Sequence, residues 1–187
     1  MKHVVRKAYW DYEKEEKWIN DMTAKGMHLD NYSWCKYTFV EGEPGEYIYR
    51  LELLENTATH AESIAYLKFL EENGVEHVSS YMRWVYLRKK ATEGPFEVYT
   101  DIESKMKYFK RVNSFWLSLS LAEITIGLAN LGIWIANQTA IEEYSKFINV
   151  NLIGGAICTF IGLGCLSLSR PLRKKMRQLK NESHVHE

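Results

Sequence analysis

The sequence has few cysteines and lacks the residue patterns of the common catalytic and metal sites. Cys35, Cys158 and Cys165 are its only cysteines, and they form no CxxC pair. An odd number without paired spacing argues against a disulfide framework and against a zinc site. The histidines show no HExxH spacing, and no Ser or Cys lies in a GxSxG motif. We therefore expect no enzyme activity, no metal site and no cofactor.

A secretory signal is also missing, and the charge has no overall sign. Residues 1–30 contain neither the apolar core nor the small-residue cleavage site of a signal peptide, so we expect insertion into a membrane to begin at an internal segment. The net charge of zero conceals two halves, about −4 for residues 1–100 and about +4 for residues 101–187. The apolar runs lie only in the second half. A boundary near Thr100 is therefore expected.

Two long apolar runs dominate the second half. Residues 114–136 and 147–169 each form about 34 Å of helix, enough to cross a bilayer. A short loop, 137–146, joins them. Basic residues gather before the first run and in the tail 170–187, whereas Lys146 is the only one in the loop. By the positive-inside rule, we expect a multi-pass protein of the cell membrane with both termini in the cytoplasm and the loop outside.

Each predicted span carries a stripe of small and polar residues. The stripes are Ser120, Glu123, Gly127 and Asn130 in the first span and Asn151, Gly155, Cys158, Gly162 and Cys165 in the second. Small residues let helix backbones approach each other. An antiparallel pair then places Glu123 near Thr159, and Asn130 near Asn151 or Leu152.

Glu123 lies deep in the predicted span, where an ionised carboxylate is costly. Two interpretations remain open. The side chain is a proton- or cation-responsive group or a contact for a polar partner helix, or it is a neutral Glu that fixes the packing of the hairpin or of a homo-oligomer.

The polar half, residues 1–94, alternates strand-like and helical patterns. Helices are predicted from Asp11 to Lys25 and from a capping box at Thr59 to Gly74, and strands over 2–9, 29–40, 46–54 and 75–89. This order, βαββαβ, is that of a ferredoxin-like α+β domain with one four-stranded sheet and both helices on one face. A linker helix over 95–113, capped by Asp101, then leads to the first span.

The predicted sheet leaves one face uncovered although aromatic residues occur on both. An exposed aromatic face suggests a binding surface for a partner or ligand. Core packing explains the same residues equally well. The candidate contact residues are Trp34, Tyr37, Tyr49, Trp84 and Tyr86.

Three segments carry a resemblance to a known family: YWDYEKEEKWINDMTAKGMHL, YTFVEGEPGEYIYRLELL and GPFEVYTDIESKMKYFKRV. Together with the paired apolar spans, they resemble the bacterial membrane family catalogued as domain of unknown function 2812. The resemblance covers residue 7 to about residue 173. It implies no activity, but members of the family are often encoded beside PadR-type transcriptional regulators, which implies a membrane-tethered regulatory role.

The leading hypothesis is therefore a membrane-anchored regulatory or sensory protein whose cytoplasmic domain binds a protein partner, with a PadR-type regulator as the candidate. The alternative is a membrane-tethered protein that binds a lipophilic small molecule without catalysis. We expect no direct binding of nucleic acid, because the domain is net negative and lacks a basic RNP-like run.

Overall fold

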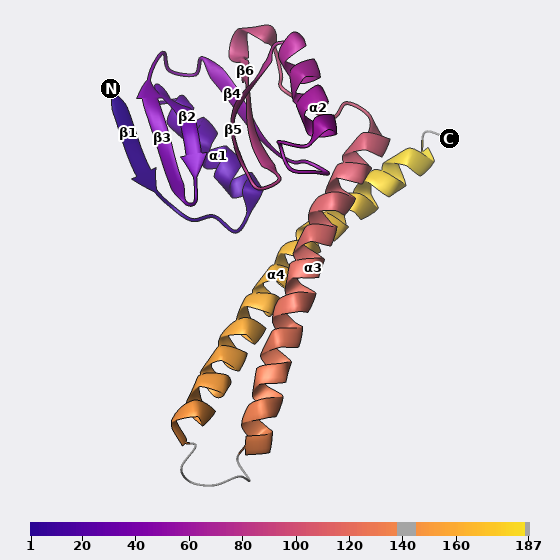
Figure 1. Cartoon of the computed structure of the whole chain (residues 1–187). Helices are drawn as coiled ribbons and strands as arrows, with labels where there is room; N and C mark the ends of the chain where they lie inside the picture. The colour runs from indigo at the N-terminus through magenta and orange to yellow at the C-terminus, as the bar shows by residue number, and fades with distance from the viewer. Residues whose placement is uncertain (138–144, 186–187) are drawn as a thin grey trace. The chain divides into compact units, whose positions relative to one another are not determined.

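A computed structural model describes residues 1–137 and 145–185 of the chain (Figure 1). The chain divides into two compact units, Met1–Thr100 and Asp101–Glu187. The first unit mixes helices and strands, and the second consists of two long helices. Most of the predicted external loop, 137–146, lies outside the described residues.

Six strands in the first unit form two antiparallel sheets of three strands, in the orders β1-β3-β2 and β4-β6-β5. Helix α1 follows β1, helix α2 follows β4, and a short 3₁₀ turn ends the unit (Figure 1). The elements are β1 Lys2–Arg6, α1 Tyr12–Thr23, β2 Met27–Ser33, β3 Lys36–Glu41, β4 Tyr47–Leu53, α2 Ala61–Glu72, β5 Val75–Tyr81, β6 Trp84–Lys90 and the turn Ala91–Glu93.

The unit is thus α+β, as expected, but the ferredoxin-like order βαββαβ in one four-stranded sheet is not confirmed. Two segments predicted as single strands, 29–40 and 75–89, each contain a tight turn that makes a hairpin. Trp34 and Cys35 form the first turn with φ of 35° and 58°, and Met82 opens the second with φ of 56°. Such turns normally use Gly, Asn or Asp. Because neither turn contains one, no sequence signal indicated the reversal.

The two sheets belong to two copies of one βαββ unit. In each copy a glycine with positive φ follows the helix, Gly26 at 78° and Gly74 at 81°. The strand that follows carries a bulge, after Leu29 in the first copy and after His77 in the second. The distance along the chain from Gly26 to Gly74 equals that from Leu29 to His77. The first unit is therefore an internal structural repeat.

Two hydrophobic clusters form the core. The first cluster joins Ile19 of α1 to Tyr37 and Phe39 of β3 and to Tyr49 and Tyr86 of the second sheet. Helix α1 therefore packs against both sheets. The second cluster lies under α2 and contains Leu54, Leu67, Leu70, Val75, Val85, Leu87 and Phe96.

The second unit consists of α3, Ile102–Asn137, and α4, Ser145–Val185. Asp101 caps α3, as predicted, because its carboxylate accepts a hydrogen bond of 2.7 Å from the backbone N–H of Ser104. That hydrogen bond lowers the pKa of Asp101. Pro171 lies inside α4, where it removes one hydrogen bond of the helix and favours a kink.

Candidate functional site

The predicted contact residues do not share one exposed sheet face. Tyr37, Tyr49 and Tyr86 are buried in the first core cluster, Trp84 is half-buried, and Trp34 is 73% exposed. The three tyrosines therefore face the interior. They are buried because α1 packs against both sheets, whereas the ferredoxin-like prediction left the aromatic face of a single sheet uncovered.

The buried carboxylate of Glu15 on α1 connects two of these tyrosines. Its acidic neighbours in the sequence are typical of a solvated helix face. The hydroxyl groups of Tyr37 and Tyr86 donate hydrogen bonds of 2.7 and 2.6 Å to the same oxygen, Oε1 of Glu15. Burial raises the pKa of Glu15, and the two hydroxyl donors oppose that rise only in part. Burial and the neighbouring carboxylate also raise the pKa of both tyrosines. The three groups tie α1 to one strand of each sheet.

The outer edge of β4 is covered by side chains of α1. Asn20 accepts a hydrogen bond of 2.8 Å from the backbone N–H of Tyr49 and donates one of 3.0 Å to the carbonyl of the same residue. Glu16 accepts hydrogen bonds of 2.9 Å from the backbone N–H of Leu51 and from Arg50. Burial raises the pKa of Glu16, and its backbone and Arg50 partners lower it. This edge is thus paired rather than free to recruit another strand.

The exposed part of the aromatic set lies at the tips of the two short turns. The ring centroid of Trp34 lies 5.9 Å from that of Tyr81, which directly precedes Met82. Met82 is 69% exposed. The hydroxyl of Ser79 on β5 also contacts Asn31 and Tyr32 on β2, which holds the two strands side by side. We call Trp34, Tyr81 and Met82 the turn-tip patch.

The turn-tip patch occupies equivalent positions of the two repeats. Trp34 is the first turn residue after β2, and Met82 is the first turn residue after β5. Both residues have positive φ, which costs a side-chain-bearing residue roughly 1–2 kcal/mol. Large apolar side chains are therefore held in a strained backbone at places where they contribute little to the core.

In the second unit, the two small-residue stripes face each other. Ser120 donates a hydrogen bond of 2.8 Å to the carbonyl of Gly162. A Cβ atom on Gly127 would lie 3.0 Å from the carbonyl oxygen of Gly155, and one on Gly155 would lie 3.0 Å from the carbonyl oxygen of Gly127. The helices therefore touch backbone to backbone, which only small residues permit. We call this contact the glycine seam.

The polar residues of the spans lie close to the predicted depths. Thr159 lies against Gly127 and donates a hydrogen bond of 2.8 Å to the carbonyl of Gly155, while Glu123 lies near Cys158, one residue away from Thr159. Asn130 donates a hydrogen bond of 2.8 Å to the carbonyl of Ile126 in its own helix, and Asn151 is half-buried. The structure thus places Glu123 on the helix–helix side, and its predicted functional roles remain predictions.

The described residues, 1–137 and 145–185, contain no group of three or more His, Cys, Asp or Glu side chains placed to hold a metal ion. Both long helices are apolar and long enough to cross a membrane. Their apolar windows are only 11% and 22% buried, whereas a core helix of a soluble protein is mostly buried.

Comparison with known proteins finds one family. Residues 11–121 match the family described as "Protein of unknown function (DUF2812)". No curated protein and no solved structure matches the chain.

Proposed function

Because the chain belongs to the DUF2812 family of proteins of unknown function, its function has to be inferred from its own geometry, and we propose that it is a membrane-anchored regulatory or sensory protein. In this proposal α3 and α4 cross the cell membrane as a hairpin, and both termini lie in the cytoplasm. The Met1–Thr100 unit binds a protein partner through the turn-tip patch.

Exposed apolar side chains on both helices support the membrane hairpin. Water would make this exposure costly, at roughly 25 cal/mol per Å² of apolar surface, whereas lipid tails would cover it. The glycine seam accounts for the small residues between the helices, as expected for spans that pack without a hydrophobic driving force. The exposed residues include Leu121, Ile126, Leu128, Ile133, Ile135, Val150, Ile153, Ile157, Phe160 and Leu163.

The strained, exposed Trp34 is the observation that carries the partner-binding proposal. Backbone strain at a non-glycine residue persists where another requirement outweighs it, and functional sites are the common case. Trp and Met are also enriched at protein interfaces. Since Trp34 adds little to the core, its side chain is best explained by an external contact.

The family resemblance suggests a PadR-type transcriptional regulator as this partner. A protein fits the turn-tip patch better than nucleic acid does, because the first unit is net negative. The alternative, a lipophilic ligand enclosed by the aromatic residues, has less support. Tyr37, Tyr49 and Tyr86 pack against other core side chains, and two of them already donate to Glu15.

Partner capture from membranes tests the proposal. Tagged full-length protein is crosslinked in its native membranes with a cleavable amine-reactive reagent, purified, and its partners are identified by mass spectrometry. We expect the wild type to recover a regulator and Trp34→Gly to lose it. The Gly variant should fold normally, because relief of the positive φ offsets the lost contact with Tyr81.

Phe69→Ala is the matched control, since Phe69 is an exposed aromatic residue on α2 of the same unit. This variant should keep the partner. Recovery of the same proteins by wild type and Trp34→Gly would show that the turn-tip patch is not the binding surface.

A further inference from the structure

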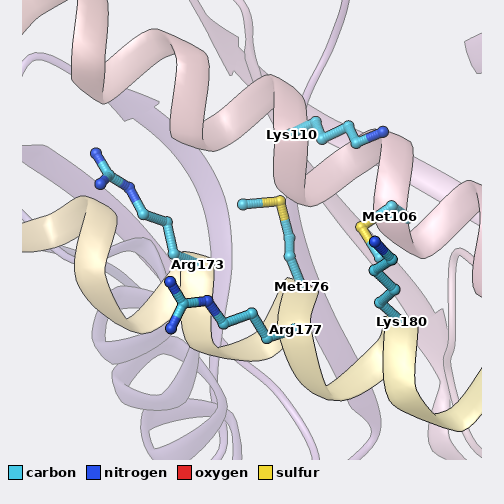
Figure 2. Close-up of a pocket in the computed structure, with 6 residues that line it drawn as sticks. All are labelled: Met106, Lys110, Arg173, Met176, Arg177 and Lys180. Carbon is cyan, nitrogen blue, oxygen red and sulfur yellow. The ribbon is translucent and has the colours of Figure 1, made fainter.

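A cavity lined by two methionines and four Lys or Arg residues lies between α3 and α4 beyond the glycine seam. Its volume is about 560 Å³, and its lining comes from both helices (Figure 2). Lys110 contributes from α3, and Arg173, Arg177 and Lys180 contribute from α4, together with Met106 and Met176. Four of these six side chains are cationic and none is acidic.

The cavity continues the seven-residue spacing of the glycine seam along both helices. Gly127 faces Gly155, and Ser120 faces Gly162, one heptad further along each helix. The next heptad brings Asn113 and Ser169, each with a buried side-chain oxygen that has no hydrogen-bond partner. The heptad after that brings two methionines, Met106 and Met176, in place of small residues. Methionine side chains thus replace small residues on the facing sides of the two helices where the cavity lies.

The end of the cavity formed by Lys110 and Arg173 lies at the level of lipid headgroups if the hairpin spans the membrane. Lys110 precedes the first apolar run by four residues, and Arg173 follows the second by four, so each lies about 6 Å of helix beyond the hydrocarbon layer. Headgroups occupy roughly the same distance on each side of a bilayer. Both cations are therefore placed where lipid phosphates lie.

We propose that this cavity is a binding site for the phosphate-bearing headgroup of an anionic phospholipid. Arg173 and Arg177 supply planar guanidinium groups that suit phosphate oxygens, and Lys110 and Lys180 add positive charge from both helices. Met106 and Met176 provide an apolar, adaptable wall beside these cations. Figure 2 shows Met176 extending from α4 toward α3 among these cations.

Both a lipid and a soluble phosphate ester present this chemistry, and the position beside the spans favours the lipid. The inference rests on the membrane insertion in the proposed function but not on the protein partner. Recovery of the protein in carbonate-washed membranes checks insertion separately. A failure of the headgroup site can thus be told from a failure of the membrane assignment.

Native mass spectrometry of the full-length protein in detergent tests the site. Phosphatidylglycerol and phosphatidylcholine are titrated in separate experiments, and glycerol 3-phosphate serves as the soluble probe. We expect one phosphatidylglycerol to bind more tightly than phosphatidylcholine. Arg173→Gln with Arg177→Gln should weaken phosphatidylglycerol binding about 30-fold, since each cation near an anionic lipid contributes roughly a factor of five.

Arg170→Gln with Lys174→Gln is the matched control, because it removes the same charge from the same tail outside the cavity lining. This control should bind the lipid as the wild type does. Lys110→Gln, on the other helix, should weaken binding about fivefold and provides a second test if the double variant folds poorly. Equal losses in the cavity and control variants, no preference over phosphatidylcholine, or binding of glycerol 3-phosphate alone would each overturn the proposal.

Discussion

Tyr86, in the last strand of the first unit, donates a hydrogen bond of 2.6 Å to Glu15 in its first helix. Tyr37 of the other sheet donates to the same carboxylate oxygen. One buried acidic group thus links both copies of the repeat through α1. A carboxylate in this position is costly unless its hydrogen bonds are made, so the arrangement specifies how the two sheets meet.

The buried Glu15 predicts that the first unit loses stability as pH rises. Burial raises its pKa above the ordinary value of 4.5, so between the two pKa values the folded protein holds a proton that the unfolded chain releases. Stability is therefore greatest below that ordinary pKa and falls as pH rises through the raised one, by about 1.4 kcal/mol for each pH unit that separates the two pKa values. Glu16 adds to the trend, because burial raises its pKa as well.

Glu15→Gln should reduce this dependence, since an amide does not titrate in this range. Denaturant unfolding of the full-length protein in detergent, followed by Trp fluorescence at pH 5 and pH 8, measures the change. The loss of stability between the two pH values should be smaller in the variant. Equal losses would show that Glu15 does not carry the pH dependence.

Asn20 predicts a large effect from a small side chain. Asn20→Leu removes the acceptor of the Tyr49 N–H and one of the two donors to the Tyr49 carbonyl, which keeps Arg50 at 3.4 Å, and a buried group left without a hydrogen bond costs roughly 1–3 kcal/mol. Asn20→Asp, the control, retains an acceptor for the N–H and should lose less. The free energy of unfolding in urea measures both variants. A neutral Asn20→Leu would mean that water or a shifted backbone replaces the amide.

The glycine seam predicts which glycines tolerate a methyl group. A Cβ atom on Gly127 would lie 2.8 Å from the backbone nitrogen of Thr159, whereas one on Gly132 would meet nothing within 4 Å. Gly127→Ala should therefore destabilise the hairpin by about 1–3 kcal/mol through overpacking, and Gly132→Ala should be neutral. Unfolding of the full-length protein in increasing SDS, followed by circular dichroism, distinguishes them. Equal effects of the two substitutions would contradict the assigned helix contact.

The sequence predicts the helices better than the sheet topology, because helix ends carry local capping signals whereas the two hairpin turns carry none. Asp11 and Gly26 bracket α1 with capping chemistry that acts locally. The small-residue spacing likewise brings Gly127 and Gly155 together, since both helices are regular over this region. The turns at Trp34 and Met82 have no such signal, because side-chain-bearing residues occupy the positive-φ positions where Gly, Asn or Asp is usual.

The predicted contact residues show the same limit. Trp34 is exposed, but Tyr37, Tyr49 and Tyr86 are buried, because alternation along a strand does not reveal what covers each face. The acidic residues next to Glu15 in the sequence indicate a solvated helix face. Glu15 is instead a buried hydrogen-bond acceptor, because tyrosines of both sheets pack against it. One signal was present in the sequence: Gly26 and Gly74 each follow a helix at matching points of the repeat.

Reporter fusions are the sharpest check that α3 and α4 form a hairpin across the membrane with both termini in the cytoplasm. One reporter that is active only in the cytoplasm and one that is active only outside are fused separately after Asn137 and after the last residue. We expect outside activity for the Asn137 fusions and cytoplasmic activity for the full-length fusions. Cytoplasmic activity at both positions, with the protein extracted by carbonate, would rule out the hairpin.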